Sequence, residues 1–410
     1  MKAAADNMPF DILTFIFNHY SEYDTPYQPV ETLLLVCKTW HNWATNNPKL
    51  WSKFNIILYD TYHTEYWASC IPRRLQKCPS STLLDITITS EPTLMSFRDC
   101  KAAFEALRVK LVGEHGELAR RWRSFVLEDV GLSQKTVAQY LQFPTPKLEE
   151  FECRKLQSPF AVLPDTSSLR TFKVSWLRNT KLPSLENVTN LRIGIIGSFD
   201  ENALASATNV VRMSIRSWDK PFRFVATYPQ LKKLELEGEI GSDCLKNIQA
   251  PQLKKLTLRV GRGSDYLHVI SSKGINLATL SSIRIMWRPI RHNSVEDIAD
   301  YLHGVKSFLA GAINLETLVL ENAEIAYLVL KLLTDDLKSL YQDHTLRIVQ
   351  AEYEIELGDG EERLPSVNRL RAMTGGIPDC SWERLFELLN DVSEQSSSDV
   401  SLSLSVGRVS

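Results

Sequence analysis

Apolar residues recur along most of the chain in a short unit of the form apolar-x-x-apolar-x-apolar. Its first apolar residue falls at nine positions: Trp122, Leu148, Leu169, Val188, Val210, Leu231, Leu253, Leu280 and Leu315. Successive copies are about 19–27 residues apart over most of the array, with a wider step before the last one. One unit this short cannot bury its apolar side alone, so the pattern predicts stacked units with a continuous core.

The two segments Pro229–Leu236 and Pro251–Leu258 are nearly identical, differing only where Glu235 stands against Thr257. Chance apolar patterning rarely produces such copies. Each unit predicts one short strand and a return segment, and Leu84–Ile88 and Leu346–Ile348 predict further strands at the two ends of the array. Ala323–Tyr341 predicts a helix within one return segment. An alternating all-β fold remains the structural alternative.

The unit resembles the leucine-rich repeat. The resemblance implies an α/β fold over residues 80–372, an irregular leucine-rich-repeat solenoid with a curved parallel sheet. The asparagine-containing tail of that repeat is mostly missing, so we expect variable return segments rather than uniform helices. Residues 376–392 predict a closing helix or cap, and the Ser-rich residues 393–410 predict a disordered tail.

Residues 8–51 follow a helical pattern instead. Pro9 and Asp11 suit the first turn of a helix, whose apolar face is wider than one buried stripe needs. Prolines interrupt the pattern before a second helical run over Glu31–Cys37, and a third aromatic segment ends at Trp51. Three short helices cannot bury this much apolar surface among themselves. The segment is therefore either a small helical cap on the next domain or an interface.

Three motifs in this segment, in the same order, resemble the F-box. They are Met8-Pro9-Phe10-Asp11-Ile12-Leu13, then Leu34-Leu35-Val36-Cys37-Lys38-x-Trp40, and finally Leu50-Trp51. Met8 and Asp11 replace the usual leucine and glutamate. The resemblance implies a three-helix F-box over residues 8–52 that docks a Skp-family adaptor. The implied adaptor-binding residues are Pro9, Ile12, Leu13, Ile16, Val36, Cys37, Lys38 and Trp40.

Within each predicted strand, the residues between the core positions point to the other face of the sheet. This face is either an ordinary solvated surface of mixed charge or a basic strip that receives an acidic or phosphorylated target segment. The basic residues assigned to target binding are Lys173, Arg192, Arg216, Arg259 and Arg284. Three tryptophans, Trp176, Trp218 and Trp287, follow the strand cores and either rim this face or plug the turns.

The net charge of −2 and pI of about 6.5 leave no global basic field, which argues against partners such as nucleic acid or an anionic membrane. The seven cysteines are scattered singly, which is typical of reduced thiols in the cytoplasm or nucleus. No apolar run approaches the ~18 residues of a membrane span, and Met1–Asn7 has no apolar signal-peptide core.

The sequence contains no phosphate-binding loop, nucleophile elbow or metal-ligand spacing, so no catalytic residue, metal or cofactor is predicted. We therefore expect a non-enzymatic substrate-recognition subunit of an SCF-type ubiquitin ligase. It would bind a Skp-family adaptor, through it a cullin scaffold, and a target protein through the repeats. The alternative is an interaction scaffold that binds the adaptor without promoting ubiquitination.

Overall fold

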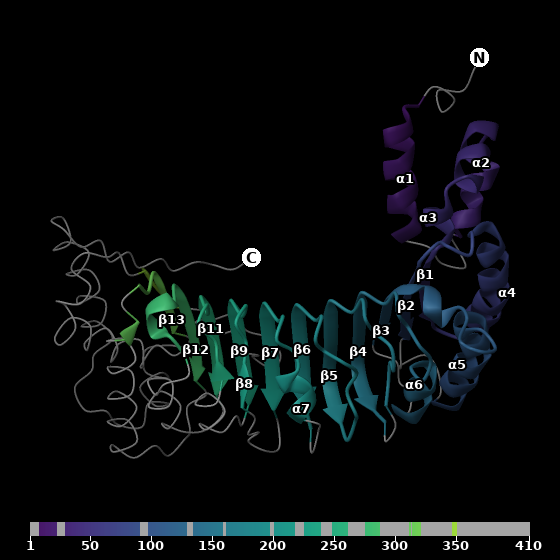
Figure 1. Cartoon of the computed structure of the whole chain (residues 1–410). Coiled ribbons are helices and arrows are strands. Elements are labelled where there is room, and N and C mark those ends of the chain that lie inside the picture. Colours follow the sequence, from purple (N-terminus) through teal and green to yellow (C-terminus); the bar gives the residue numbers. More distant parts are fainter. Residues whose placement is uncertain are drawn as a thin grey trace, which may run out of the picture. The chain divides into compact units, whose positions relative to one another are not determined.

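The computed structural model (Figure 1) consists of N-terminal helices followed by a parallel β-solenoid, and it divides into two compact units, residues 1–220 and 221–410. The structure describes residues 8–22, 29–90, 97–128, 134–158, 161–196, 201–217, 225–238, 248–260, 275–287, 311–312, 314–320 and 347–350. The sequence predictions for Ala323–Tyr341, residues 376–392, residues 393–410 and Trp218 lie outside the described residues.

Three α-helices and one 3-10 helix form the N-terminal part, here called the helical module. They are α1 (Phe10–Glu22), η2 (Val30–Leu35), α2 (Lys38–Thr45) and α3 (Pro48–Trp51). The second run is a 3-10 helix that ends earlier than predicted, because Cys37 is extended and serves as the N-cap of α2. The module buries a small core that includes Phe17, Leu33 and Trp51, and the indole N–H of Trp51 donates to the Ala44 carbonyl at 2.6 Å.

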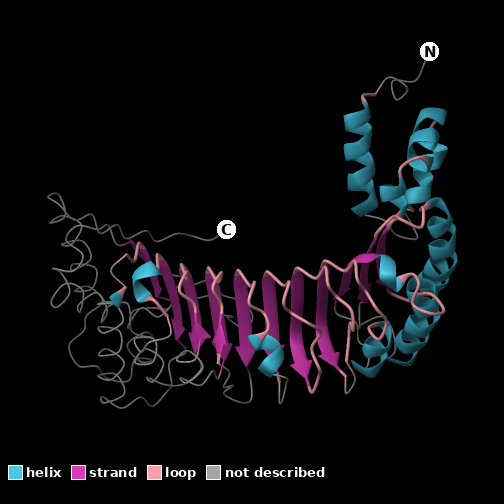
Figure 2. Ribbon diagram, viewed as in Figure 1, coloured by secondary structure: helices cyan, strands magenta, loops and turns pink. Residues whose placement is uncertain are grey.

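In the first unit, seven described strands pair in parallel and in chain order. Figure 2 shows the later ones as a row of magenta arrows. They are β1 (Lys53–Leu58), β2 (Leu84–Ser90), β3 (Trp122–Glu128), β4 (Glu150–Gln157), β5 (Thr171–Arg178), β6 (Asn190–Ile195) and β7 (Arg212–Ser217). Alternate side chains of each strand enter the core, as in the burial of Phe54, Ile56 and Leu58 of β1.

The second unit continues the same pattern, with β9 next to β11, then β12, β13 and β14, all parallel. Their bounds are β9 (Lys233–Gly238), β11 (Lys255–Val260), β12 (Ser282–Trp287), β13 (Thr317–Leu320) and β14 (Arg347–Gln350). The short strands β8 (Ala226–Thr227) and β10 (Ile248–Gln249) pair separately, and η4 spans Leu277–Thr279. The predicted parallel strands, including the outlying ones at Leu84 and Leu346, are therefore confirmed.

The first apolar residue of every repeat copy has the same structural role. Its backbone N–H closes a turn onto the carbonyl three residues earlier, as Leu148 does with Thr145 and Leu253 with Ala250. All nine of these residues are buried, and the turn lets the chain enter the next strand directly after it. The repeat that the sequence predicts is thus a strand preceded by a fixed turn.

Aromatic rings from neighbouring strands stack inside the first unit. Phe125 in β3, Phe151 in β4 and Phe172 in β5 occupy paired positions in the register. Their ring centroids lie 6.5 Å apart between the first two and 5.5 Å apart between the last two, and Trp122 stacks on Phe125 at 4.2 Å. Each of these four side chains is fully buried, so the rings form one continuous ladder.

The return segments vary along the chain, as the missing repeat tail predicts. Helices α4 (Thr61–Lys77), α5 (Phe97–Val112) and α6 (Gln134–Tyr140) follow β1, β2 and β3, with the short η3 (Ala119–Arg121) before β3. Among the described residues, the later returns carry the short helices α7 (Glu201–Ala205) and η4. Residues 53–79, for which the repeat pattern predicts no element, form β1 and α4.

Candidate interaction surfaces

The helical module presents a group of large apolar side chains to solvent. Phe10, Ile12 and Phe15 of α1 are 65%, 49% and 72% exposed, and Leu35 and Val36 at the end of η2 are 83% and 52% exposed. Several large apolar side chains exposed on two short helical segments are typical of a protein-binding surface. We call these five residues the apolar patch.

The predicted adaptor-binding residues divide between this surface and the module's core. Pro9, Ile12, Val36 and Lys38 are exposed, whereas Leu13 is only 3% exposed and belongs to the core. The remaining three, Ile16, Cys37 and Trp40, are partly buried.

Three members of the apolar patch, Phe10, Phe15 and Leu35, are absent from the predicted set. The signal for Phe15 was present in the sequence, because the apolar face of α1 is wider than the stripe formed by Leu13 and Phe17. The stripe itself is packed against α2, because Phe17 lies edge-on to Trp40 and Trp43, with ring centroids 5.0 Å and 4.5 Å away.

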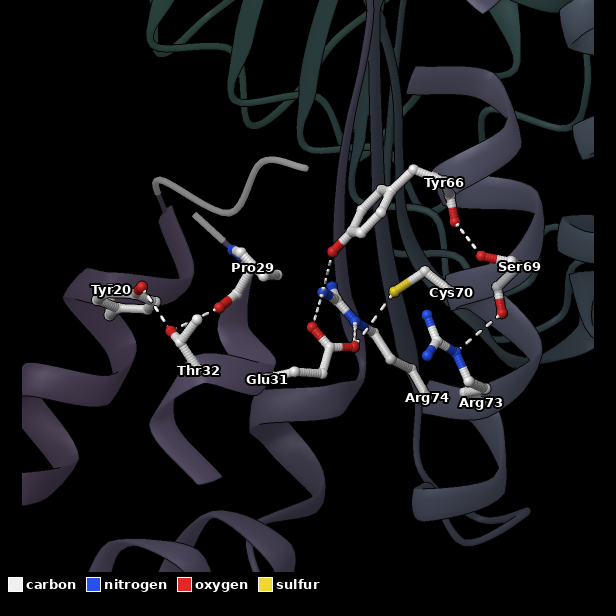
Figure 3. Close-up of polar contacts among 9 residues, drawn as sticks. All are labelled: Tyr20, Pro29, Glu31, Thr32, Tyr66, Ser69, Cys70, Arg73 and Arg74. Carbon is white, nitrogen blue, oxygen red and sulfur yellow. Dashed lines mark hydrogen bonds and ion pairs between the residues drawn. The ribbon is translucent and has the colours of Figure 1, made fainter. Parts of the chain in front are cut away.

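A polar contact joins the helical module to α4 (Figure 3). The Arg74 guanidinium donates to both carboxylate oxygens of Glu31 in η2, at 2.9 and 2.7 Å. It also donates a hydrogen bond to the hydroxyl oxygen of Tyr66 at 3.4 Å. The Cys70 thiol also donates to Glu31, at 3.3 Å. Arg74 is almost completely buried, with 1% of its side chain exposed, so the Glu31 carboxylate offsets part of the cost of burying its charge.

The ionisation of Glu31 follows from this arrangement. Burial by itself raises the pKa of a carboxyl group, but the hydrogen bonds and positive charge of Arg74 outweigh it, and the pKa of Glu31 is lowered from 4.5. A second contact runs between α4 and α3, where the Lys77 ammonium lies 3.9 Å from the centroid of the Trp51 ring. The module therefore has bonded contacts with the helix that follows β1.

The described cysteines Cys37, Cys70, Cys78 and Cys153 are all free thiols. Burial raises the pKa of Cys70 and of Cys153 to about 12, and that of Cys78 to about 11. These three thiols therefore stay protonated at neutral pH and act as small core residues.

On the outer face of the first unit's sheet, Lys173 is already paired. Its ammonium lies 2.8 Å from a Glu152 carboxylate oxygen and 3.4 Å from one of Glu150, both on the neighbouring strand β4. Arg192 occupies the next position across the sheet, in register with Lys173 on β5 and Ser214 on β7, and its side chain is exposed.

Arg216 of β7 is half-buried and lies in register with Gly194 of β6. The first unit thus brings Lys173 and Arg192 together on adjacent strands, with Arg216 one strand further.

The two remaining basic candidates belong to the second unit. Arg259 of β11 contacts Glu237 at 3.4 Å and Glu235 at 3.6 Å, both on β9, and is half-buried. Arg284 of β12 is half-buried in register with Thr257. The predicted strip is therefore interspersed with carboxylates, which pair with Lys173 and Arg259.

Strand β5 contains a bulge that the sequence pattern did not reveal. Its buried positions Phe172, Val174 and Leu177 are spaced by two and then three residues, and the register with β6 shifts between Val174 and Leu177. Ser175 and Trp176 therefore lie between two register pairs that Gly194 alone separates on β6. The bulge turns Trp176 outward, with 41% of its surface exposed.

The environment of Trp176 favours the surface interpretation for this tryptophan rather than a turn plug. Its partner in the register is Lys155 of β4, whose ammonium lies 5.8 Å from the ring centroid. The side chain of Trp287, in β12, is not among those the structure describes.

Within the part of the chain that the structure describes, no three His, Cys, Asp or Glu side chains are placed together to hold a metal ion. Among those same residues, no helix combines the length and apolar character needed to cross a bilayer.

Comparison with known proteins identifies no family: no protein-family model matches the sequence, and no curated protein matches it.

Proposed function

We propose that this protein is the substrate-recognition subunit of an SCF-type ubiquitin ligase. Its helical module acts as an F-box that docks a Skp-family adaptor, and its irregular leucine-rich repeats bind a target protein. The observation that carries the proposal is the apolar patch on α1 and η2, because it exposes five large apolar side chains on the segment whose motifs resemble the F-box.

The division of labour within the module supports this assignment. Leu13, Phe17 and Leu33 belong to the buried core, whereas Phe15 and Leu35 are exposed and are not packed against it. Burying one such side chain contributes about 1.5–3 kcal/mol, which makes a patch of five an adequate anchor for a stable complex. The catalytic contribution of such a subunit is proximity, because it holds a target near the ubiquitin-charged enzyme.

The decisive experiment is co-purification of the full chain with a Skp-family adaptor, using a Phe15→Glu/Leu35→Glu double variant. We expect a stable wild-type complex and a loss of affinity of about 100-fold or more in the variant, because each substitution places a charge in the apolar contact. Both side chains are largely exposed, so the variant's circular dichroism and melting temperature should match those of the wild type.

The matched control is Val225→Glu, which places the same charge on a side chain that is 74% exposed and lies outside the module. It should bind the adaptor as the wild type does. The proposal fails if the wild-type chain does not bind the adaptor, or if the double variant binds as tightly as this control. Ubiquitination of a captured target in a reconstituted ligase would then distinguish a ligase subunit from a scaffold.

A further inference from the structure

The bulge in β5 is accompanied by a matching irregularity in β4. There, the buried positions Phe151, Cys153 and Leu156 have the same spacing of two and then three residues. Two consecutive side chains of β4, Arg154 and Lys155, are consequently exposed, and Lys155 is in register with Trp176. The paired irregularities thus present a tryptophan and its basic neighbours together on the outer face of the sheet.

A further cation lies at the same end of these strands. Arg178, two residues beyond Trp176, is exposed and in register with Gln157 of β4. Neither Lys155 nor Arg178 forms an ion pair with a residue that the structure describes. We call Lys155, Trp176 and Arg178 the bulge cluster.

The carboxylates of β4 do not neutralise the bulge cluster. Glu150 and Glu152 lie nearer the start of the strand and both contact the Lys173 ammonium. Charge on this part of the sheet is therefore separated along the strands. A group of one lysine and two glutamates, with more negative than positive charge, precedes the bulge, and a basic group with an exposed ring follows it.

We propose that the bulge cluster binds an extended acidic segment of a target protein. An apolar side chain of the segment packs on the exposed ring of Trp176, and neighbouring carboxylates or phosphates pair with Lys155 and Arg178. Trp and Arg are among the residues that most often dominate binding energy at interfaces. This inference rests on the target-binding half of the proposed function, for which it supplies a place and a chemical class of ligand.

A peptide fits the bulge cluster better than a nucleic acid does. Single-stranded nucleic acids are held by several aromatic side chains on which successive bases stack, together with a long basic groove. The described outer face around β4 and β5 offers one exposed tryptophan, and the whole chain carries a net charge of −2. The single Trp176 ring between the cations Lys155 and Arg178 is complementary to a peptide with one apolar residue and acidic neighbours.

The test measures fluorescence anisotropy of short labelled peptides with the full-length chain. The probe alternates glutamate and serine around a central leucine, a second has the serines phosphorylated, and a third has glutamine in place of glutamate. We expect the first two to bind and the third to bind at least about tenfold more weakly, with affinity falling as salt rises. The first two probes distinguish carboxylate from phosphate as the preferred anion.

Two variants then locate the site. Trp176→Ala and Lys155→Glu should each weaken binding by about tenfold or more. The control Lys147→Glu places the same charge change on an exposed lysine in the turn before β4, and it should leave affinity unchanged. All three positions are exposed, so thermal melting should confirm that each variant is folded.

The proposal is overturned if neither acidic peptide binds, or if Trp176→Ala and Lys155→Glu bind like Lys147→Glu. Preferential binding of a single-stranded oligonucleotide or of anionic lipid vesicles would also overturn it. Because the adaptor is absent from this assay, a failure here leaves adaptor docking intact. Conversely, if the chain binds the acidic peptides but not the adaptor, the result contradicts only the proposed role in a ubiquitin ligase.

Discussion

Gly194 shows how a single missing side chain shapes the outer face of the sheet. A Cβ atom built at this position would lie 1.8 Å from the carbonyl oxygen of Ser175, which is far inside van der Waals contact. The bulge in β5 is therefore compatible only with glycine at this position of β6, unless the backbone moves. The same bulge exposes Trp176, so the two residues are structurally coupled across the strands.

Replacing Gly194 with alanine should therefore destabilise the chain. We expect a loss of about 2–3 kcal/mol in the free energy of unfolding, because the new methyl group forces two paired strands apart. Chemical denaturation followed by circular dichroism measures this loss. The control Ser214→Ala, on the neighbouring strand β7, should change stability by less than about 0.5 kcal/mol. Equal effects of the two substitutions would contradict the steric argument.

At this scale, sequence pattern predicts core positions well and surface positions poorly. All nine leading repeat residues are buried, as the apolar spacing of the repeat predicts. The sequence pattern did not predict that Leu13 lies in the core and Phe15 on the surface, because both belong to one wide apolar face of α1. The bulge in β5 could not be predicted from the sequence of β5 alone, because it depends on Gly194, which lies some twenty residues away from Ser175.

At the scale of elements, α4 connects the helical module to the first strands. The buried guanidinium of Arg74 has Glu31 as its ionic partner, and Cys78, directly after the helix, enters the module's core. The contacts of the module thus continue past residue 52, where the F-box resemblance ends. Neither β1 nor α4 was predicted, although apolar and polar residues alternate in Lys53–Leu58, and Pro72 interrupts the helical pattern of α4.

Substituting Glu31 with glutamine should lower the free energy of unfolding by about 3 kcal/mol at neutral pH, because the buried Arg74 loses the carboxylate that accepts two of its hydrogen bonds. Denaturation with urea provides the measurement. The double variant Glu31→Leu/Arg74→Met removes both charges and should recover most of the loss. If it is as unstable as the single variant, the ion pair is not the source of the effect.

The same pair makes a defined contribution to acid sensitivity. Because the folded pKa of Glu31 lies below 4.5, the stabilisation is complete above that pH and is lost as the pH falls through the folded value. Stability of the wild type should therefore decline more steeply than that of Glu31→Gln below pH 4.5. Parallel slopes for the two proteins would show that Glu31 does not titrate in this way.

At the scale of the whole molecule, the predicted α/β architecture is confirmed as N-terminal helices and a parallel β-solenoid. The repeat made this possible, because each copy carries its own turn and core positions. Assignment to the leucine-rich-repeat and F-box families stays a proposal. Which partners the surfaces bind could not be predicted from periodicity, since alternation defines which side chains face outward but not what they meet.

The contacts of α4 predict how the chain can be divided. A fragment of residues 1–52 lacks Arg74 and Cys78, so we expect it to lose cooperative thermal unfolding. Residues 1–220 retain the helical module, α4 and all seven strands of the first unit, and should melt cooperatively. Circular dichroism during heating distinguishes the two. A sharp transition in the shorter fragment would show that the module is stable without α4.

The aromatic ladder of the first unit has a consequence for how the chain reaches its folded state. Phe125, Phe151 and Phe172 each cover the ring before them, and their partners are the nearest repeats in the sequence. A newly synthesised repeat therefore finds its docking surface on the repeat that left the ribosome just before it. Folding can then advance one rung at a time from the N-terminal end, with only the last ring exposed to solvent at each step.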